Sequence, residues 1–376
     1  MKRKAGPGKL LCLVLAICMC AGLSGACRID AAENTALWGK ELYIVPEEVP
    51  AAALQGENAQ CCGVAPGGRL LIIADDRSYL YDTETGQQIP LKPGNEFATE
   101  GLICKAKGWF CEQRSREWMQ VFKPKGGGGR CLLNTDTGDY YRFRDEIPLD
   151  GQGDEILLLS RDGISFSRFD CITGARTPVE WSDTSETGTL QTMTGGYLPS
   201  GGLYAVVRDP DQPGTQLRIR ELDGSEESYD LGALHVTAND RSIWRAGGRW
   251  LLLYDTLTLS MPPLLVDRKE GTVSVLFLNQ GKAELLPLQE LLRENGTVRV
   301  PDEQRAQLRY WPILEIPEEN CLLLAFADMG QLALYRPDTA SLQLIHGEIS
   351  YVGPASGDGE GLLFMDVIGL VRLKEH

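Results

Sequence analysis

The sequence predicts an all-β fold, a β-propeller built from four-stranded antiparallel blades, and three observations predict it. One module recurs: a glycine-rich turn, an apolar run, a short polar turn, an alternating strand ending in an aromatic residue, and a turn of Asp, Thr and Gly type. The turn positions of the successive copies are Gly86, Gly138, Gly174, Gly224, Gly281 and Ala340. They are separated by 52, 36, 50, 57 and 59 residues, which suits one blade per turn. Helical periodicity is scarce, with residues 287–295 as its best example.

Residues 67–91 show the module most fully. Residues 70–74 form the continuous apolar run of a strand buried on both faces, and residues 79–81 begin the next strand. The segment DTETG at 82–86 then closes a tight turn in which Gly86 can adopt a positive φ. Because a lone four-stranded meander cannot bury both of its faces, the copies are expected to stack against one another.

Counting the copies predicts seven blades, with six or eight as alternatives. Six copies lie near residues 58–95, 101–147, 153–181, 187–232, 238–290 and 310–347. The C-terminal stretch supplies only three strands, near residues 349–352, 361–367 and 369–373. We expect residues 41–45 to supply the missing strand, which would join the two ends of the chain and leave no open sheet edge. Residues 37–376 would thus form a single propeller domain with a helical insertion near residues 287–309.

Residues 1–26 are typical of a signal peptide, because four basic residues precede an apolar and small stretch at 10–26. The segment LSGAC at 23–27 resembles a bacterial lipobox, and the resemblance implies cleavage and lipidation at Cys27. It departs from the usual pattern at Ser24, so simple cleavage before Cys27 is the alternative. Residues 27–36 would be a tether, and the protein would lie at the outer face of the cytoplasmic membrane or be secreted.

The charge of the chain excludes a class of partners. Without the four basic residues of the leader, 33 Lys and Arg face 52 Asp and Glu, a net charge of −19. Such a surface repels nucleic acid and anionic lipid headgroups. Membrane attachment is therefore expected only through an acyl chain on Cys27.

Candidate catalytic and metal-binding residues are few, and we predict no catalytic residue, no metal site and no cofactor. The three histidines, His235, His346 and His376, are too far apart in sequence for a recognisable metal or charge-relay motif. The acidic candidates are Asp75 with Asp76, Glu318 with Glu319, and the loop pair Asp209 and Asp211. The first two pairs could serve a glycosidase, and the loop pair a calcium ion, although rigid or solvated turns explain them more simply.

The remaining candidates are cysteines and tryptophans. Cys104 and Cys111 could pair across a hairpin, and the adjacent Cys61 and Cys62 could be a redox pair, although strand alternation would put them on opposite faces. Trp118 and Trp181 stand among charged residues and could be exposed stacking platforms. We favour burial between blades for both, because propeller sheets pack through large side chains.

The turn sequences YDTETG at 81–86 and FDCITG at 169–174 resemble those of bacterial propellers grouped as WD-repeat-like or quinoprotein-dehydrogenase-like. The chain departs from true WD repeats, since it has no Trp-Asp dipeptide and no Gly-His pair. The resemblance implies a fold and does not assign a function.

Two functions remain open at the level of sequence. The first is a non-catalytic binding or scaffold propeller, a membrane-tethered monomer whose partner is an extracytoplasmic protein or a small ligand. The alternative is a propeller-type glycosidase or lyase, whose paired carboxylates would converge within about 5 to 10 Å at one mouth of the central channel.

Overall fold

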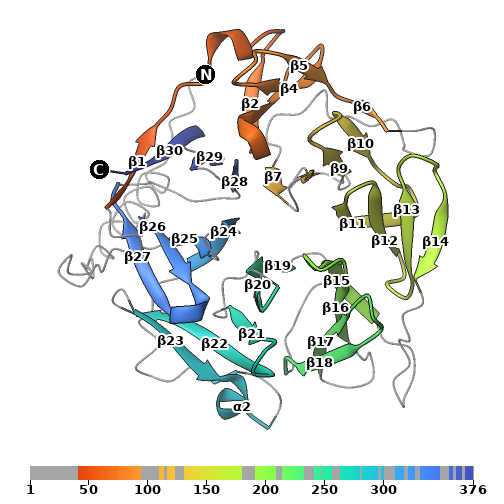
Figure 1. The fold of residues 1–376 in the computed structure, drawn as a ribbon, viewed down its shortest axis with the longest axis vertical. Helices are drawn as coiled ribbons and strands as arrows, with labels where there is room; N and C mark the ends of the chain where they lie inside the picture. Colours follow the sequence, from red (N-terminus) through yellow and green to blue (C-terminus); the bar gives the residue numbers. More distant parts are fainter. Residues whose placement is uncertain are drawn as a thin grey trace, which may run out of the picture.

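The chain folds into a ring of seven β-sheets, the blades of a β-propeller, arranged around a central axis (Figure 1). The structure is a computed structural model that describes residues 41–94, 110–113, 117–122, 131–179, 191–208, 214–232, 241–246, 248–255, 263–279, 282–294, 298–299, 310–316, 321–326, 331–347, 355–358, 361–365 and 369–375. The prediction of seven four-stranded blades is confirmed.

Each blade is an antiparallel meander whose first strand lies near the axis and whose last strand lies at the rim (Figure 1). Blades 1 and 2 contain β2 (Gln60–Ala65), β3 (Arg69–Ile73), β4 (Ser78–Asp82) and β5 (Gln88–Pro90), then β7 (Phe110–Gln113), β8 (Trp118–Phe122), β9 (Cys131–Asn134) and β10 (Asp139–Tyr141). Blades 3 and 4 contain β11 (Glu146–Gln152), β12 (Glu155–Ser160), β13 (Phe166–Asp170) and β14 (Arg176–Val179), then β15 (Gln191–Tyr197), β16 (Leu203–Arg208), β17 (Thr215–Arg220) and β18 (Glu226–Asp230). Blades 5 and 6 contain β19 (Arg241–Ala246), β20 (Trp250–Asp255), β21 (Leu264–Asp267) and β22 (Thr272–Asn279), then β24 (Tyr310–Ile316), β25 (Cys321–Phe326), β26 (Gln331–Arg336) and β27 (Ser341–Ile345).

Two blades carry an additional strand at the rim. β6 (Lys92–Pro93) leaves blade 1 and pairs parallel to β10 of blade 2, whereas β23 (Lys282–Pro287) extends blade 5 by pairing antiparallel to β22. Such added strands cover the open edge of the sheet that they join.

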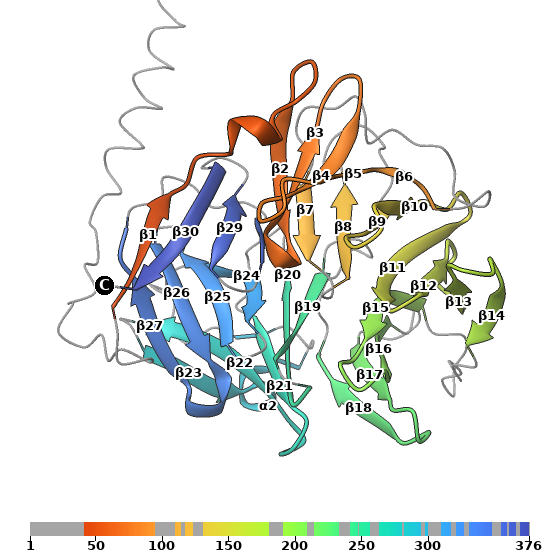
Figure 2. The same ribbon diagram turned by 45° about the horizontal axis from the view of Figure 1, so that its top comes forward.

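Blade 7 closes the ring with both ends of the chain. It consists of β28 (Ala355–Gly357), β29 (Leu362–Met365), β30 (Gly369–Glu375) and, as its outer strand, β1 (Leu42–Pro46). The backbone N–H of Ile44 donates to the carbonyl of His346 at 2.8 Å, so β1 is also tied to the end of blade 6. Figures 1 and 2 both show β1 beside β30. The predicted closure by residues 41–45 is therefore confirmed, while the predicted strand at 349–352 lies outside the described residues.

The predicted boundary between blades 2 and 3 is wrong. The sequence predicts one copy that ends at residue 147 and another that begins at residue 153, but residues 146–152 form β11, the first strand of blade 3. Pro148, Asp150 and Gly151 give this segment the composition of a turn. A β-bulge between Pro148 and Asp150 accommodates it in the sheet.

The recurring Asp–Thr turn joins the third strand of a blade to the fourth. In blade 1 the Asp82 carboxylate accepts hydrogen bonds from the backbone N–H of Thr85 at 2.7 Å and of Glu84 at 3.1 Å, and Gly86 has a φ of 69°. The turns at Asn134 and Asp170 repeat this pattern.

In blade 5 the equivalent turn runs from Asp267 to Gly271, whose φ is 68°. The choice of Gly281 as the turn of this copy was therefore wrong. The additional strand β23 follows β22 and introduces a second hairpin, which sequence spacing could not separate from the first.

Apolar side chains fill the spaces between blades. Among the described residues, seven clusters of buried side chains are found, one at each junction between neighbouring blades. Burial of this surface is the main force that holds the ring together. The predicted helix at 287–295 is seen only as α2 (Leu288–Leu291), because Leu292 is extended with a ψ of 134°. Leu288 and Leu291 pack on the core between blades 4 and 5.

Candidate functional site

The acidic pair Asp75 and Asp76 lies in the exposed turn between β3 and β4. The Asn58 amide donates to the Asp75 carboxylate, and the backbone N–H of Glu57 donates to Asp76 at 3.2 Å. Both carboxylates therefore brace one loop of blade 1, which is a structural role.

Several other described carboxylates accept hydrogen bonds in turns or link neighbouring blades. Backbone N–H donors hold the pKa of Asp82 and of Asp170 below its ordinary value, foremost those of Thr85 and Thr173. Asp150, buried on the inner strand β11, accepts from the backbone N–H of Tyr197 at 2.8 Å and thereby joins blades 3 and 4.

Several predicted candidates lie outside the described residues: Cys27, Cys104, Trp181, Asp209, Asp211, His235, Glu318, Glu319 and His376. Within the described ranges, no group of three or more His, Cys, Asp and Glu side chains is placed to hold a metal ion. Within the same ranges, no helix has the length and apolarity needed to span a bilayer. The described histidine, His346, stacks on Tyr43 with ring centroids 5.0 Å apart.

Trp118 is fully buried between blades 2 and 3, which confirms the preferred prediction for this residue. Its indole N–H donates to the carbonyl of Gly153 at 3.0 Å. The indole rests on Gly151, where a Cβ atom would lie only 2.5 Å from the ring. Trp118 therefore belongs to the core and not to a binding face.

Cys61 and Cys62 lie on opposite faces of blade 1, as strand alternation predicts. Cys62 is part of the core shared with blade 2, whereas Cys61 packs against the core shared with blade 7. Burial raises the pKa of the Cys61 thiol to about 11, so this cysteine is poorly ionised at neutral pH.

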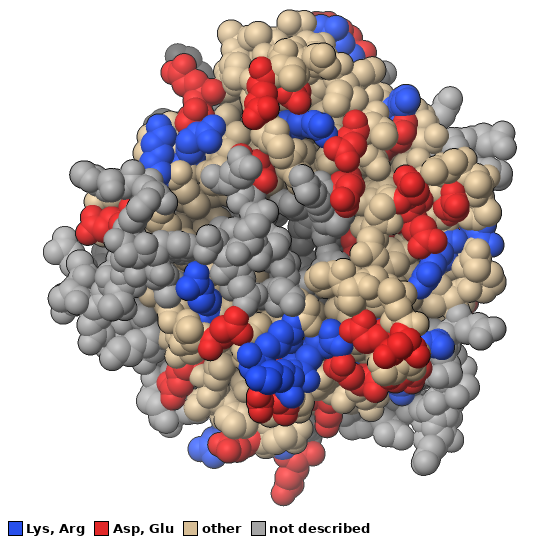
Figure 3. All heavy atoms as spheres, in the orientation of Figure 1, with Lys and Arg blue, Asp and Glu red and all other residues tan. Residues whose placement is uncertain are grey.

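Arginines link neighbouring blades at the turns. Arg268 of blade 5 donates to Glu221 and Glu227 of blade 4, at 2.6 Å each. Arg249 donates to Asp267 of its own blade at 2.6 Å and contacts Asp338 of blade 6 at 3.3 Å. Figure 3 shows basic side chains beside acidic ones on the face in view.

The junction between blades 3 and 4 differs from the others in its outer half. The face of β17 that looks toward blade 3 carries Gln216, Arg218 and Arg220, which pair with Val207, Ala205 and Leu203 on β16. At the next junction, the corresponding positions of β21 are Leu264 and Val266, which are buried against blade 4. Charged side chains are costly to bury. In this half of the junction the two blades therefore do not pack tightly against each other through an apolar core.

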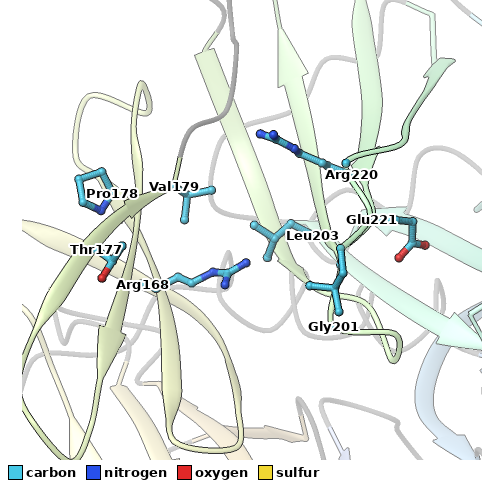
Figure 4. Close-up of a pocket in the computed structure, with 11 residues that line it drawn as sticks. Arg168, Thr177, Pro178, Val179, Gly201, Leu203, Arg220 and Glu221 are labelled. Atoms are coloured by element: carbon cyan, nitrogen blue, oxygen red, sulfur yellow. The ribbon is translucent and has the colours of Figure 1, made fainter.

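A cavity of about 350 Å³ lies at this open half of the junction. Its lining residues are Arg168, Thr177, Pro178, Val179, Gly201, Gly202, Leu203, Arg220, Glu221, Leu222 and Gly224. Figure 4 shows the guanidinium groups of Arg168, from β13, and Arg220, from β17, directed into the space between the two blades. We refer to this cavity as the blade 3–4 groove.

Two basic side chains, Arg168 and Arg220, and one acidic side chain, Glu221, line the groove. The Glu221 carboxylate is turned away from the two arginines in Figure 4. It accepts hydrogen bonds from Arg268 at 2.6 Å and from the Ser200 hydroxyl at 2.7 Å. Its charge is thus paired outside the groove, while Arg168 forms an ion pair with Glu155 at 3.9 Å and Arg220 one with Glu226 at 3.8 Å.

Sequence reasoning missed this groove. The signal lay in residues 215–220, where the strand alternates apolar Leu217 and Ile219 with Gln216, Arg218 and Arg220. Such alternation is usual for a strand that has one buried face and one solvent-exposed face. Only its position at the junction with blade 3 makes it unusual, and that position requires the fold.

No protein-family model matches this sequence, and no curated protein matches it. Among solved structures, the chain is similar to the Cps50 (Swd1) β-propeller domain of Myceliophteria thermophila, with 13% identity, a TM-score of 0.47, and coverage of 86% of this chain and 98% of that one. An extracellular domain assigned to a hybrid two-component system of B. thetaiotaomicron gives 13% identity and a TM-score of 0.45, over 89% of this chain and 40% of that one. A hydrazine synthase chain of Kuenenia stuttgartiensis gives 10% identity and a TM-score of 0.45, over 88% and 98% of the two chains. The assignment of the architecture rests on the seven sheets themselves: the chain is a seven-bladed β-propeller.

Proposed function

We propose that the protein is a non-catalytic binding propeller, exported and tethered to the outer face of the membrane through a lipidated Cys27, and that it binds its ligand in the blade 3–4 groove. One observation carries the proposal. Arg218 and Arg220 of blade 4 face blade 3, whereas the equivalent residues of blade 5, Leu264 and Val266, pack in the apolar core against blade 4. A fold that can close this junction with apolar side chains, yet keeps it polar and open, has the property expected of a binding site.

The geometry of the chain ends is compatible with tethering. Leu42 begins β1 opposite Glu375, on the side of blade 7 where the third and fourth strands of other blades are joined by turns. The 14 residues between Cys27 and Leu42 can span at most about 50 Å. A lipid on Cys27 would therefore hold the ring close to the membrane.

The anchor is tested by labelling cells that express the full chain with a radioactive fatty acid and then separating membrane from soluble fractions. The wild-type protein should be labelled and found with the membranes. Cys27→Ala should lose the label and leave the membrane fraction. A Cys27→Ala protein that stays labelled or membrane-bound would overturn this part of the proposal.

The binding site is tested by photo-crosslinking in intact cells. A photoreactive amino acid is placed at Thr177 or Leu222, which line the groove, and at Glu84, an exposed residue in the equivalent turn of blade 1, as the matched control. We expect discrete adducts from positions 177 and 222 and none from 84. Equal labelling from all three positions, or no adduct from the groove, would overturn the assignment of the site.

A further inference from the structure

Arg168 is placed to accept an anionic ligand. Its Nη1 atom lies 3.9 Å from the Glu155 carboxylate, far longer than the 2.6 Å contacts that Arg268 makes with its partners. Its Nε atom is buried without a hydrogen-bond partner. A guanidinium group donates to carboxylate and phosphate oxygens through its Nη atoms, so Arg168 can bind an anion that enters the groove.

Arg220 faces Arg168 from the opposite wall. Its Nε atom forms an ion pair with the Glu226 carboxylate at 3.8 Å. Figure 4 shows both guanidinium groups converging on one space from different blades. An anion bound between the two guanidinium groups could accept hydrogen bonds from both.

The walls of the groove around the two arginines are largely apolar. Val179 and Pro178 belong to blade 3, and Leu203 and Leu222 to blade 4. Leu222 is 70% exposed, an unusual setting for so large an apolar side chain. An apolar group in the groove would remove these surfaces from water.

The size of the groove indicates the size of the ligand. A cavity of about 350 Å³ falls at the lower end of the range for small-molecule sites. The planar guanidinium fork matches the geometry of carboxylates and of phosphate groups. We infer that the groove selects a small organic anion, with a carboxylate or phosphate head between Arg168 and Arg220 and an apolar body against Val179, Leu203 and Leu222. This inference rests on the proposed binding function of the same groove.

The inference is tested by fluorine NMR on the protein purified in detergent from cells that express the full chain. Three probes share one apolar ring: para-fluorobenzoate, para-fluorophenyl phosphate and the neutral para-fluorobenzyl alcohol. We expect the resonance of at least one anion to broaden in the presence of the protein, while that of the alcohol stays sharp. The anion that binds more tightly identifies the head group.

Substitutions locate the binding. Arg168→Gln and Arg220→Gln should each weaken the preferred anion at least about tenfold, because each removes a charged donor. Arg77→Gln, on the exposed turn of blade 1, is the matched control and should bind as the wild type does. Binding of the alcohol as tightly as the anions, or wild-type affinity in both groove variants, would overturn the inference, as would a failure of all three probes to bind.

The outcome separates this inference from the proposed function. Crosslinking at positions 177 and 222 that continues in cells, together with no preference for anions in the NMR experiment, would leave the binding function standing and refute the ligand class. Loss of both results would refute the two together.

Discussion

Trp118 and Gly151 provide a quantitative test of how neighbouring blades pack. The indole of Trp118 fills the junction between blades 2 and 3, and its N–H is bonded to Gly153 at 3.0 Å. Trp118→Ala should destabilise the protein by about 3 to 5 kcal/mol, the usual cost of removing a buried aromatic side chain. Gly151→Ala should cost about 1 to 3 kcal/mol, because the new methyl group would approach the indole to 2.5 Å.

The two effects should not add. Once Trp118 is alanine, the methyl group at position 151 meets the space that the indole has left, so Gly151→Ala should cost little in that background. Urea denaturation followed by far-ultraviolet circular dichroism gives the free energy of unfolding for the four proteins of the cycle. The exposed substitution Ile172→Ala should change stability by less than about 0.5 kcal/mol and serves as a control. Strict additivity of the two substitutions would refute the contact between β8 and β11 as described.

Three further predictions concern the turns, the closure and the cysteines. Asp82→Ala should cost about 1 kcal/mol at neutral pH, while Asp82→Asn should be close to wild type because Asn134 fills the same turn position in blade 2. Since the folded-state pKa of Asp82 is lowered, its charge stabilises the fold above about pH 4, and that contribution is lost as the pH falls further. Urea denaturation at several pH values in this range should show the loss of stability. A difference in unfolding free energy between wild type and Asp82→Asn that stays constant with pH would count against this role of the charge. Removal of the chain through Pro46 should expose the edge of β30 and cause self-association, which light scattering would detect. A synthetic peptide of residues 41–47 should reverse the association. A truncated protein that stays monomeric with an unchanged melting temperature would contradict closure by β1. Burial raises the pKa of Cys131 to about 12, so iodoacetamide at pH 8 should modify this thiol only after unfolding in urea. Rapid native-state labelling of Cys131 detected by mass spectrometry would disprove its burial.

The architecture could be predicted from the sequence because residues close together in the chain form the turn of each repeat. The turns at Asp82 and Asp170 are each held by local hydrogen bonds to the Asp carboxylate, which is followed by a glycine. The turns can therefore be recognised in the sequence without knowledge of tertiary contacts. The same holds for closure, since the predicted strands within residues 349–374 leave one blade a strand short and residues 41–45 have a strand-like pattern.

The features that escaped prediction depend on contacts between distant segments. β11 contains Pro148 and Gly151, which are unfavourable in strands. It forms a strand because it pairs with β12 and because Gly151 leaves room for the indole of Trp118. Gly271 and Gly281 are both plausible turn glycines, and only the pairing of β22 with β23 distinguishes their roles. The blade 3–4 groove joins Arg168 to Arg220 across two sheets, a juxtaposition that no local pattern contains.

If Arg168 and Arg220 keep the groove open for binding, the fold should not need their charges. The double variant Arg168→Met and Arg220→Met replaces both charges with apolar side chains of similar length. Its free energy of unfolding in urea should lie within about 1 kcal/mol of the wild type, or above it, because sister junctions are stable with apolar side chains at these positions. A loss of more than about 2 kcal/mol would show that the arginines hold blades 3 and 4 together, and it would contradict their assignment to a binding site.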